Sequence, residues 1–312
     1  MNKLTYLAIL CISICMTSCG DPEDISKDLL DGNVIFDASI YQPEKFLVSA
    51  KYPNPTLSDL NKHILIAVHG YSATTFEWQE FQDYSDPNGP YRVSQVLLDG
   101  HGRTYSDFKD ATWNDWSWAI KREYEKLEEL GYTKISMVGS STGGPLLLEL
   151  VSSGYFNSHI PPKNIFLIDP IVVSSIKLQS IAGIVGPMLG YVKKEQEGDE
   201  KKYWYKFRPH ETVNELNNLM KLIRKELESG FSLPQGTYLK CYHSKHDPTA
   251  SSTSTVMIYK GLTTCSGQPI DVEIMDSEFH VFTRLALRKA STALDFANQE
   301  KAFSEMASKL SN

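Results

Sequence analysis

The sequence predicts an α/β protein whose mainly parallel sheet carries helices on both faces. From His63 onward, short apolar runs alternate with longer stretches of helical periodicity, which is the layout of strands joined by crossover helices. One apolar run leads into a glycine-rich turn, VGSSTGG (residues 138–144). The connection between residues 168 and 237 is far longer than one crossover helix needs, which predicts an inserted cap.

Six apolar runs are expected to form strands, and the stretches between and after them are expected to form helices. The expected strands cover residues 63–68, 94–98, 134–138, 164–168, 237–242 and 271–275. The expected helices cover about 112–130, 142–152, 211–229, 249–261 and 282–310. We therefore expect one domain at 33–312, with the cap inserted at about 171–210.

The N-terminal segment has the pattern of a bacterial lipoprotein signal. Its apolar run, residues 4–16, is too short to span a bilayer and follows a positive charge. The sequence MTSCG that follows resembles a lipobox, in which the chain is cut before a cysteine that receives lipid. We expect a signal peptide at 1–18, lipid on Cys19, an acidic tether at 19–32 and a place in the bacterial cell envelope, lipid-anchored to a membrane. A plain signal peptide with an incidental cysteine is the alternative.

The charge of the chain limits its partners. Its formal net charge is -7, and it has no block of Lys and Arg residues. A nucleic-acid partner is therefore disfavoured on electrostatic grounds, and an uncharged substrate is favoured.

Two cysteines remain beyond the signal segment, Cys241 and Cys265. They could pair in an oxidising compartment, but their geometry is open at the level of the sequence. Their spacing does not suggest a metal site, which would need more ligands nearby.

The glycine-rich turn offers a nucleophile. In the frame G-x-S-x-G, Gly139 and Gly143 flank Ser141, whereas Ser140 does not fit that frame. Such a turn forces the central serine into a strained conformation, and small neighbours let the strand and the helix pass closely. An ordinary glycine-rich turn between a strand and a helix is the alternative.

A nucleophilic serine needs a base, and the base needs an acid that orients it. In a sheet of this kind the acid and then the histidine follow the serine along the chain, each after a later strand. Asp247 follows the expected strand 237–242, and His280 follows the expected strand 271–275. We predict Ser141, Asp247 and His280 as the catalytic residues, with Asp169 as the alternative acid.

Two backbone N–H groups are expected to stabilise the oxyanion of the reaction. One belongs to Thr142, the residue after the nucleophile, and the other to Tyr71, in the loop AVHGYS after the first strand. His69 in that loop is expected to stabilise the turn and not to act as a second base.

Several motifs together resemble the carboxylesterase and monoacylglycerol lipase branch of the α/β-hydrolase family. They are HGYSATTFEW, LLDGHGRTYSD, TWNDW, GYTKISMVGSSTGG, HSKHD and the late EFH, in the family's order and spacing from about His63 onward. The resemblance implies an α/β-hydrolase fold, ester hydrolysis through a serine acyl-enzyme, a small helical cap and no cofactor. Thr142 departs from the family, in which methionine or glutamine is frequent, so the usual acyl preference does not transfer.

These observations predict a serine hydrolase that cleaves carboxylic esters with short to medium acyl chains. Its substrate would be a small ester or an acylglycerol, its membrane contact would be the N-terminal lipid, and no obligate protein partner is evident. The apolar first half of the cap, including Ile181, Ile184 and Leu189, is expected to roof the acyl pocket, with Tyr203 and Trp204 closing its far end. A carbohydrate esterase of the acetyl or feruloyl type and a catalytically idle surface binding lipoprotein are the alternatives.

Overall fold

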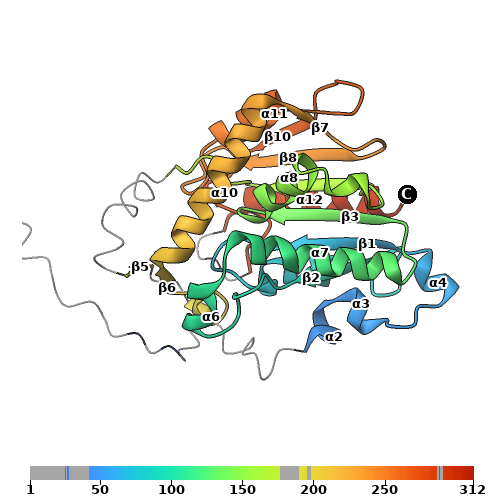
Figure 1. The fold of residues 1–312 in the computed structure, drawn as a ribbon, viewed down its shortest axis with the longest axis horizontal. Helices are drawn as coiled ribbons and strands as arrows, with labels where there is room; N and C mark the ends of the chain where they lie inside the picture. Colours follow the sequence, from blue (N-terminus) through green and yellow to red (C-terminus); the bar gives the residue numbers. More distant parts are fainter. Residues whose placement is uncertain are drawn as a thin grey trace, which may run out of the picture.

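A six-stranded parallel sheet lies at the centre of the molecule (Figure 1). Its strand order is β10-β8-β4-β3-β1-β2, and every neighbouring pair is parallel. The strands are β1 (His63–Val68), β2 (Tyr91–Val96), β3 (Ile135–Ser140), β4 (Asn164–Ile168), β8 (Tyr238–Ser244) and β10 (Asp271–Met275). The predicted class of a mainly parallel α/β protein is confirmed.

The computed structural model describes residues 25, 27, 42–175, 190–194, 198–286, 288 and 291–312. The predicted signal peptide, the lipid site Cys19, nearly all of the acidic tether and the start of the predicted domain lie outside the described residues. The predicted roof residues Ile181, Ile184 and Leu189 lie outside them as well.

The strands are apolar on both faces because both faces of the sheet are covered. Along β1, Ile64, Ile66 and Val68 belong to one hydrophobic cluster, whereas Leu65 and Ala67 belong to another. Side chains alternate between the faces of a strand, so a near-continuous apolar run such as HILIAV is the expected sequence of a strand buried on both sides.

The helices form two layers over the sheet. Side chains of α7 (Trp113–Glu129), α8 (Gly143–Ser152), α10 (His210–Ser229) and α11 (Thr253–Gly261) join the first cluster. Those of α5 (Gln79–Tyr84) and α12 (Ala293–Leu310) join the second. In Figure 1, α7 and α8 cross in front of the sheet and α12 lies behind it. Helices on both faces are therefore present, as predicted.

Shorter elements complete the described residues. The short helices are α2 (Pro43–Phe46), α3 (Val48–Lys51), α4 (Leu57–Leu60), α6 (Tyr105–Asp110), η2 (Thr75–Trp78), η3 (Tyr155–Asn157) and η4 (Gly198–Lys202). The short strands are the antiparallel pair β5 (Tyr191–Lys193) and β6 (Phe207–Pro209), and the parallel pair β7 (Phe231–Ser232) and β9 (Leu262–Thr263).

The sequence-based prediction places the start of the last helix too early. α12 begins at Ala293, not at Phe282, because Thr292 and Asp295 form a capping box at that point. Turns follow residue 280, and in them Phe282 and Leu285 are buried. These two apolar residues lie three apart, which mimics one face of a helix.

Two other elements also differ from the prediction in their boundaries. β2 covers Tyr91–Val96 in place of the predicted 94–98, and α11 begins at Thr253 in place of 249. The residues before α11 instead bond the side chain of Asp247, as described below. The rest of the predicted strands and helices agree with the structure to within two residues.

The second half of the predicted cap packs over the carboxyl end of the sheet. The Tyr205 hydroxyl donates to the carbonyl oxygen of Arg103 at 2.7 Å, and its ring stacks on Phe108 at 4.2 Å between centroids. Tyr203 stacks on Phe76 at 3.7 Å. These contacts fix the described part of the cap to the loops that follow β1 and β2.

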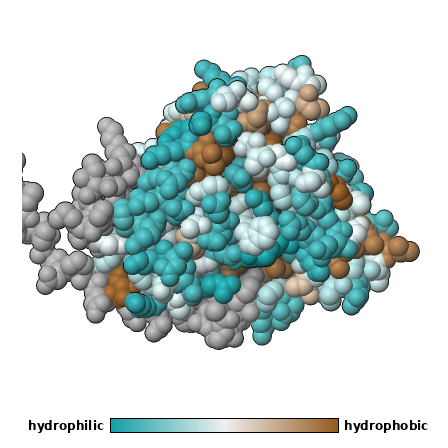
Figure 2. Space-filling view, in the orientation of Figure 1, coloured by the Kyte–Doolittle hydropathy of each residue, from teal (hydrophilic) through white to brown (hydrophobic). Residues whose placement is uncertain are grey.

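The visible face of the molecule is largely hydrophilic, and its hydrophobic residues form small separate spots (Figure 2). Within the part of the chain that the structure describes, no helix combines the length and the apolar character that a bilayer crossing requires. Cys241 is buried in β8, Cys265 is exposed, and both are free thiols. The possible pairing of these two cysteines is therefore not present. Burial raises the pKa of Cys241 to about 12.

Candidate active site

The turn predicted to be a nucleophile elbow joins β3 to α8 at the middle of the sheet. Ser141 has a left-handed backbone conformation, with φ 50°, which is costly for a residue with a side chain. A Cβ atom on Gly139 would lie 2.5 Å from the carbonyl carbon of Gly143, and one on Gly143 would lie 2.6 Å from the Val68 carbonyl oxygen. Glycine is thus required on both sides of the turn. This strained backbone distinguishes the elbow from an ordinary turn.

The structure brings together the three residues predicted to be catalytic. The Oγ atom of Ser141 lies 2.8 Å from Nε2 of His280, and Nδ1 of His280 lies 2.7 Å from Oδ2 of Asp247. The three side chains follow β3, β8 and β10, whose carboxyl ends meet at one edge of a parallel sheet. They form one hydrogen-bonded line from acid to base to hydroxyl.

Backbone hydrogen bonds fix the carboxylate of Asp247 in its position beside His280. Its Oδ1 atom accepts hydrogen bonds from the backbone N–H groups of Thr249 at 2.7 Å and Ala250 at 2.9 Å. Burial alone would raise the pKa of Asp247, but His280 and these donors outweigh it, so the pKa is lowered. The carboxylate therefore faces His280 in its ionised form.

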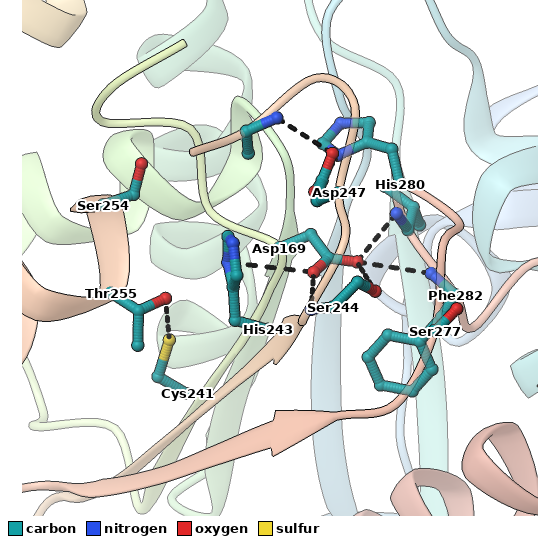
Figure 3. Close-up of polar contacts among 12 residues, drawn as sticks. Asp169, Cys241, His243, Ser244, Asp247, Ser254, Thr255, Ser277, His280 and Phe282 are labelled. Atoms are coloured by element: carbon teal, nitrogen blue, oxygen red, sulfur yellow. Dashed lines mark hydrogen bonds and ion pairs between the residues drawn. The ribbon is translucent and has the colours of Figure 1, made fainter. Parts of the chain in front are cut away.

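Asp169, the alternative acid, bonds backbone groups and not the His280 ring, and so joins separate segments of the chain (Figure 3). It accepts the N–H groups of Ser244 at 2.5 Å, Val281 at 2.8 Å and Phe282 at 3.3 Å. Burial and then the nearby charge of Asp247 raise its pKa. Asp169 thus links β4 to β8 and to the residues that follow His280.

The residue after the histidine is itself strained. Val281 has φ 56°, a conformation that β-branched residues rarely adopt. Its N–H group is held by Asp169, and its side chain is buried. The bond from Asp169 therefore offsets the cost of a backbone turn that directs the His280 ring toward Ser141.

Asp247 also belongs to a group of side chains that could act as metal ligands. Among the described residues, Asp169, His243 and Asp247 offer ligand atoms within 4.8 Å of one another. Figure 3 shows His243 beside Asp169, on the side away from His280. The hydrogen bonds described above already satisfy both carboxylates, so the arrangement has no need of a cation. We assign no metal to this group.

The predicted oxyanion donors line the same cavity as Ser141 and His280. Thr142 precedes α8, and Tyr71 follows Gly70 in the loop after β1. The carbonyl oxygen of Gly70 accepts from Nδ1 of His69 at 2.8 Å. In a trans peptide the N–H points opposite to the carbonyl, so the Tyr71 N–H points away from His69.

His69 has the structural role that was expected. It is fully buried, and its Nε2 atom accepts from the Leu98 N–H at 3.1 Å while Nδ1 donates to Gly70. Burial lowers its pKa to about 4, so the ring is neutral near pH 7. With both ring nitrogens engaged by backbone groups, His69 fixes the loop.

Sequence reasoning missed the charged lining of the cavity, whose volume is about 100 Å³. Among the described residues the charged lining side chains are Glu77, Lys194, Glu200, Arg208 and Arg284. The highly charged stretch 192–208 was a signal for three of them. Arg284 lay in a segment predicted to be helical, and Glu77 in an aromatic loop, so the sequence offered no comparable sign.

Comparison with known proteins identifies the fold. No family model matches the chain. A metagenome-derived lipolytic enzyme, one of the pair LipS and LipT, is 16% identical with a TM-score of 0.61, over 80% of this chain and 94% of that one. Monoglyceride lipase from Saccharomyces cerevisiae is 11% identical with a TM-score of 0.59, over 80% and 86%.

Est1E from Butyrivibrio proteoclasticus, solved with ferulic acid, is similar at a TM-score of 0.53 and 15% identity, over 83% of this chain and 92% of that one. Together with the parallel sheet and its two helical layers, these likenesses show an α/β-hydrolase fold, as the sequence predicted. At these identities they show the fold alone, and a fold does not determine a substrate.

Proposed function

We propose that this protein is a serine hydrolase that cleaves carboxylic esters through an acyl-enzyme. The observation that carries the proposal is the hydrogen-bonded line from Asp247 through His280 to Ser141, at a strained elbow beside a cavity. A binding protein has no need of this arrangement, which argues against the idle binding lipoprotein.

The geometry supports the following chemistry. As Ser141 Oγ attacks the ester carbonyl carbon, His280 Nε2 takes its proton, and Asp247 stabilises the imidazolium that forms. The negative charge on the carbonyl oxygen is met by the N–H groups of Tyr71 and Thr142. The carbon–oxygen bond to the alcohol then breaks, and His280 protonates the leaving alkoxide. Water next attacks the acyl carbon while His280 takes one of its protons. The bond between the acyl carbon and Ser141 Oγ then breaks, and His280 returns the proton to Oγ as the acid leaves.

Short to medium acyl chains fit the described cavity best. Its volume is about 100 Å³, and its apolar lining includes Ile171, Leu216 and Val281. Each buried CH₂ group contributes about 0.8 kcal/mol, so affinity should rise with chain length until this space is filled. The lipolytic enzyme and the monoglyceride lipase among the similar structures support ester substrates, and the ferulic acid of Est1E keeps a carbohydrate esterase as the alternative.

A labelled fluorophosphonate, followed by a panel of esters, tests this function. The purified protein should react covalently with the probe and should hydrolyse esters in a panel that varies the acyl and alcohol halves separately. A strong preference for acetylated or feruloylated sugars over simple alkyl esters would favour the carbohydrate esterase. Absence of both labelling and turnover in correctly folded protein would contradict the proposal.

We also propose that Cys19 carries lipid and anchors the protein in the bacterial cell envelope. The support is the sequence MTSCG after a short apolar run. One acyl chain holds a protein weakly and two or more hold it stably. Cys19→Ser is expected to move the protein to the soluble fraction and to prevent uptake of labelled palmitate.

A matched control for that variant is Cys265→Ser. Cys265 is an exposed free thiol in a loop, so its loss should leave membrane partition and palmitate uptake unchanged. If Cys19→Ser behaves like this control, the N-terminal segment is an ordinary signal peptide.

A further inference from the structure

A buried glutamate connects the loop after β1 to the turn that carries the nucleophile. Glu77 belongs to η2 and is 5% exposed. Its Oε1 atom accepts a hydrogen bond from the Gly70 N–H at 2.7 Å, and the hydroxyl of Ser140 donates to the same atom. One oxygen atom therefore joins the two segments that carry the proposed oxyanion donors, the N–H groups of Tyr71 and Thr142.

The backbone at Gly70 lies against the nucleophile. A Cβ atom at this position would lie 2.9 Å from the Cβ atom of Ser141 and 3.4 Å from its Oγ atom, so glycine is needed there. Glycine also has more backbone freedom than any other residue. The direction of the next N–H group, that of Tyr71, therefore has to be fixed by hydrogen bonds to the loop.

Two side chains fix the backbone on the two sides of Gly70. Glu77 accepts the N–H of Gly70, and Nδ1 of His69 donates to its carbonyl oxygen at 2.8 Å. Because each peptide group is planar, the first bond fixes the plane before Gly70 and the second fixes the plane between Gly70 and Tyr71. If the bond to Glu77 is lost, the plane that carries the Tyr71 N–H can tilt about the glycine backbone.

The position of Glu77 is fixed by its own contacts. Its N–H donates to the carbonyl oxygen of Thr74 at 3.1 Å. The next residue, Trp78, is 1% exposed, and its indole N–H donates to the carbonyl oxygen of Val68, at the end of β1, at 3.0 Å. A side chain that is locked by packing and by hydrogen bonds can hold other groups in one geometry.

We propose that Glu77 is a positioning residue of the oxyanion hole, whose Oε1 atom sets the direction of the Tyr71 N–H and its distance from Thr142. The inference rests on the proposed esterase function, and Glu77 acts through the backbone of the loop. Misplacing a catalytic group by about 1 Å can cost about 10²-fold in rate. Loss of Oε1 should therefore lower kcat by about 10²-fold and leave KM nearly unchanged, because the oxyanion forms only after the ester is bound.

Three substitutions of Glu77 separate the accepting oxygen from charge and size. Glu77→Gln keeps an oxygen of the same reach, so most of kcat should remain. Glu77→Met has a similar length but no strong acceptor, and it should show the full loss of about 10²-fold. Glu77→Asp keeps the charge but is one methylene group shorter, so kcat should also fall. The aspartate variant tests the same point if the methionine variant does not fold.

The measurement is the ratio of kcat/KM for para-nitrophenyl butyrate to kcat/KM for its thionoester, in which sulfur replaces the carbonyl oxygen. Sulfur is the weaker hydrogen-bond acceptor, so the thionoester gains less from the two N–H donors. In Glu77→Met this ratio should fall by about tenfold or more. A variant that has lost only stability would lose both rates equally and keep the ratio. Fluorophosphonate labelling to completion counts the assembled sites in each variant.

Glu123, on α7, provides a matched control. It is 3% exposed, and its Oε1 atom likewise accepts from a backbone N–H, that of Ser49 at 3.2 Å, and from a hydroxyl, that of Ser94 at 2.6 Å. Its side chain does not line the cavity beside Ser141. Glu123→Met should therefore lower the free energy of unfolding and leave the ratio of ester to thionoester unchanged.

The outcomes separate this proposal from the esterase function. An unchanged ratio in Glu77→Met and Glu77→Asp, in proteins that label with the probe, would overturn the role of Glu77 and leave the esterase function standing. Equal losses of kcat in Glu77→Gln and Glu77→Met, or a similar fall of the ratio in Glu123→Met, would also overturn it. A wild-type protein that neither labels nor cleaves either substrate would instead count against the esterase function itself.

Discussion

Replacing Ser141 with alanine is expected to abolish fluorophosphonate labelling and to reduce ester turnover to near the uncatalysed rate. Ser141 provides the hydroxyl 2.8 Å from the base, so its loss removes the atom that would form the acyl-enzyme. The measurement is in-gel fluorescence of the labelled protein, together with kcat for an ester that the wild type cleaves. Labelling that survives the substitution would place the nucleophile elsewhere.

Ser140→Ala is the matched control for that experiment. Ser140 is fully buried, and its hydroxyl donates to the side chain of Glu77 and, at 3.3 Å, to the Val68 carbonyl oxygen. It therefore points away from the base, and the variant should still be labelled. The two serines are adjacent in the sequence, and each variant removes one hydroxyl group. The comparison therefore tests the position of the nucleophile and not the general loss of a serine.

The largest effects after loss of the nucleophile are expected at the base and its acid. His280→Ala should remove almost all turnover. Asp247→Asn should lower kcat by up to about 10⁴-fold, by analogy with another catalytic triad, because the imidazole would lose its orientation and its ionic partner. Both effects are measured as kcat at saturating ester, with circular dichroism to show that the variants are folded.

Asp169→Asn tests the assignment of the acid. In the structure the His280 ring bonds Asp247 at 2.7 Å, whereas the oxygens of Asp169 bind backbone N–H groups and not the ring. The amide keeps one acceptor oxygen, so the loss in kcat should be much smaller than for Asp247→Asn, while stability falls. A greater loss of kcat for Asp169→Asn than for Asp247→Asn would mean that the acid is misassigned.

The sheet and the positions of the candidate site residues could be predicted because their signals are local. A strand buried on both faces needs a continuous apolar run, as in His63–Val68, and the elbow needs glycine at positions 139 and 143 to avoid contacts of 2.5–2.6 Å. Parallel strands bring their carboxyl ends to one edge, so the order Ser141, Asp247, His280 along the chain predicts their meeting in space.

Other features depend on contacts between distant segments. Arg284 becomes part of the cavity because Glu200 and Trp204 hold its guanidinium from the other side, and no local pattern encodes that meeting. Val281 adopts its left-handed conformation because Asp169, 112 residues earlier, accepts its N–H. A helix was predicted through this region since buried Phe282 and Leu285 have helical spacing, but tertiary bonds decide the backbone there.

The late position of β10 in the sequence determines when a growing chain contains all three residues of the proposed catalytic site. The elbow needs only β1, β3, β4 and α8, all of which are complete before residue 170, whereas His280 follows the edge strand and lies 139 residues after Ser141. At about 5 to 20 residues per second, synthesis of that interval takes roughly 7 to 28 s. During this time Ser141 has no base and is chemically an ordinary alcohol. The proposed catalytic site is therefore incomplete during most of the synthesis of the chain, and all three of its residues are present only after the last sheet strand and the loop that follows it have been added.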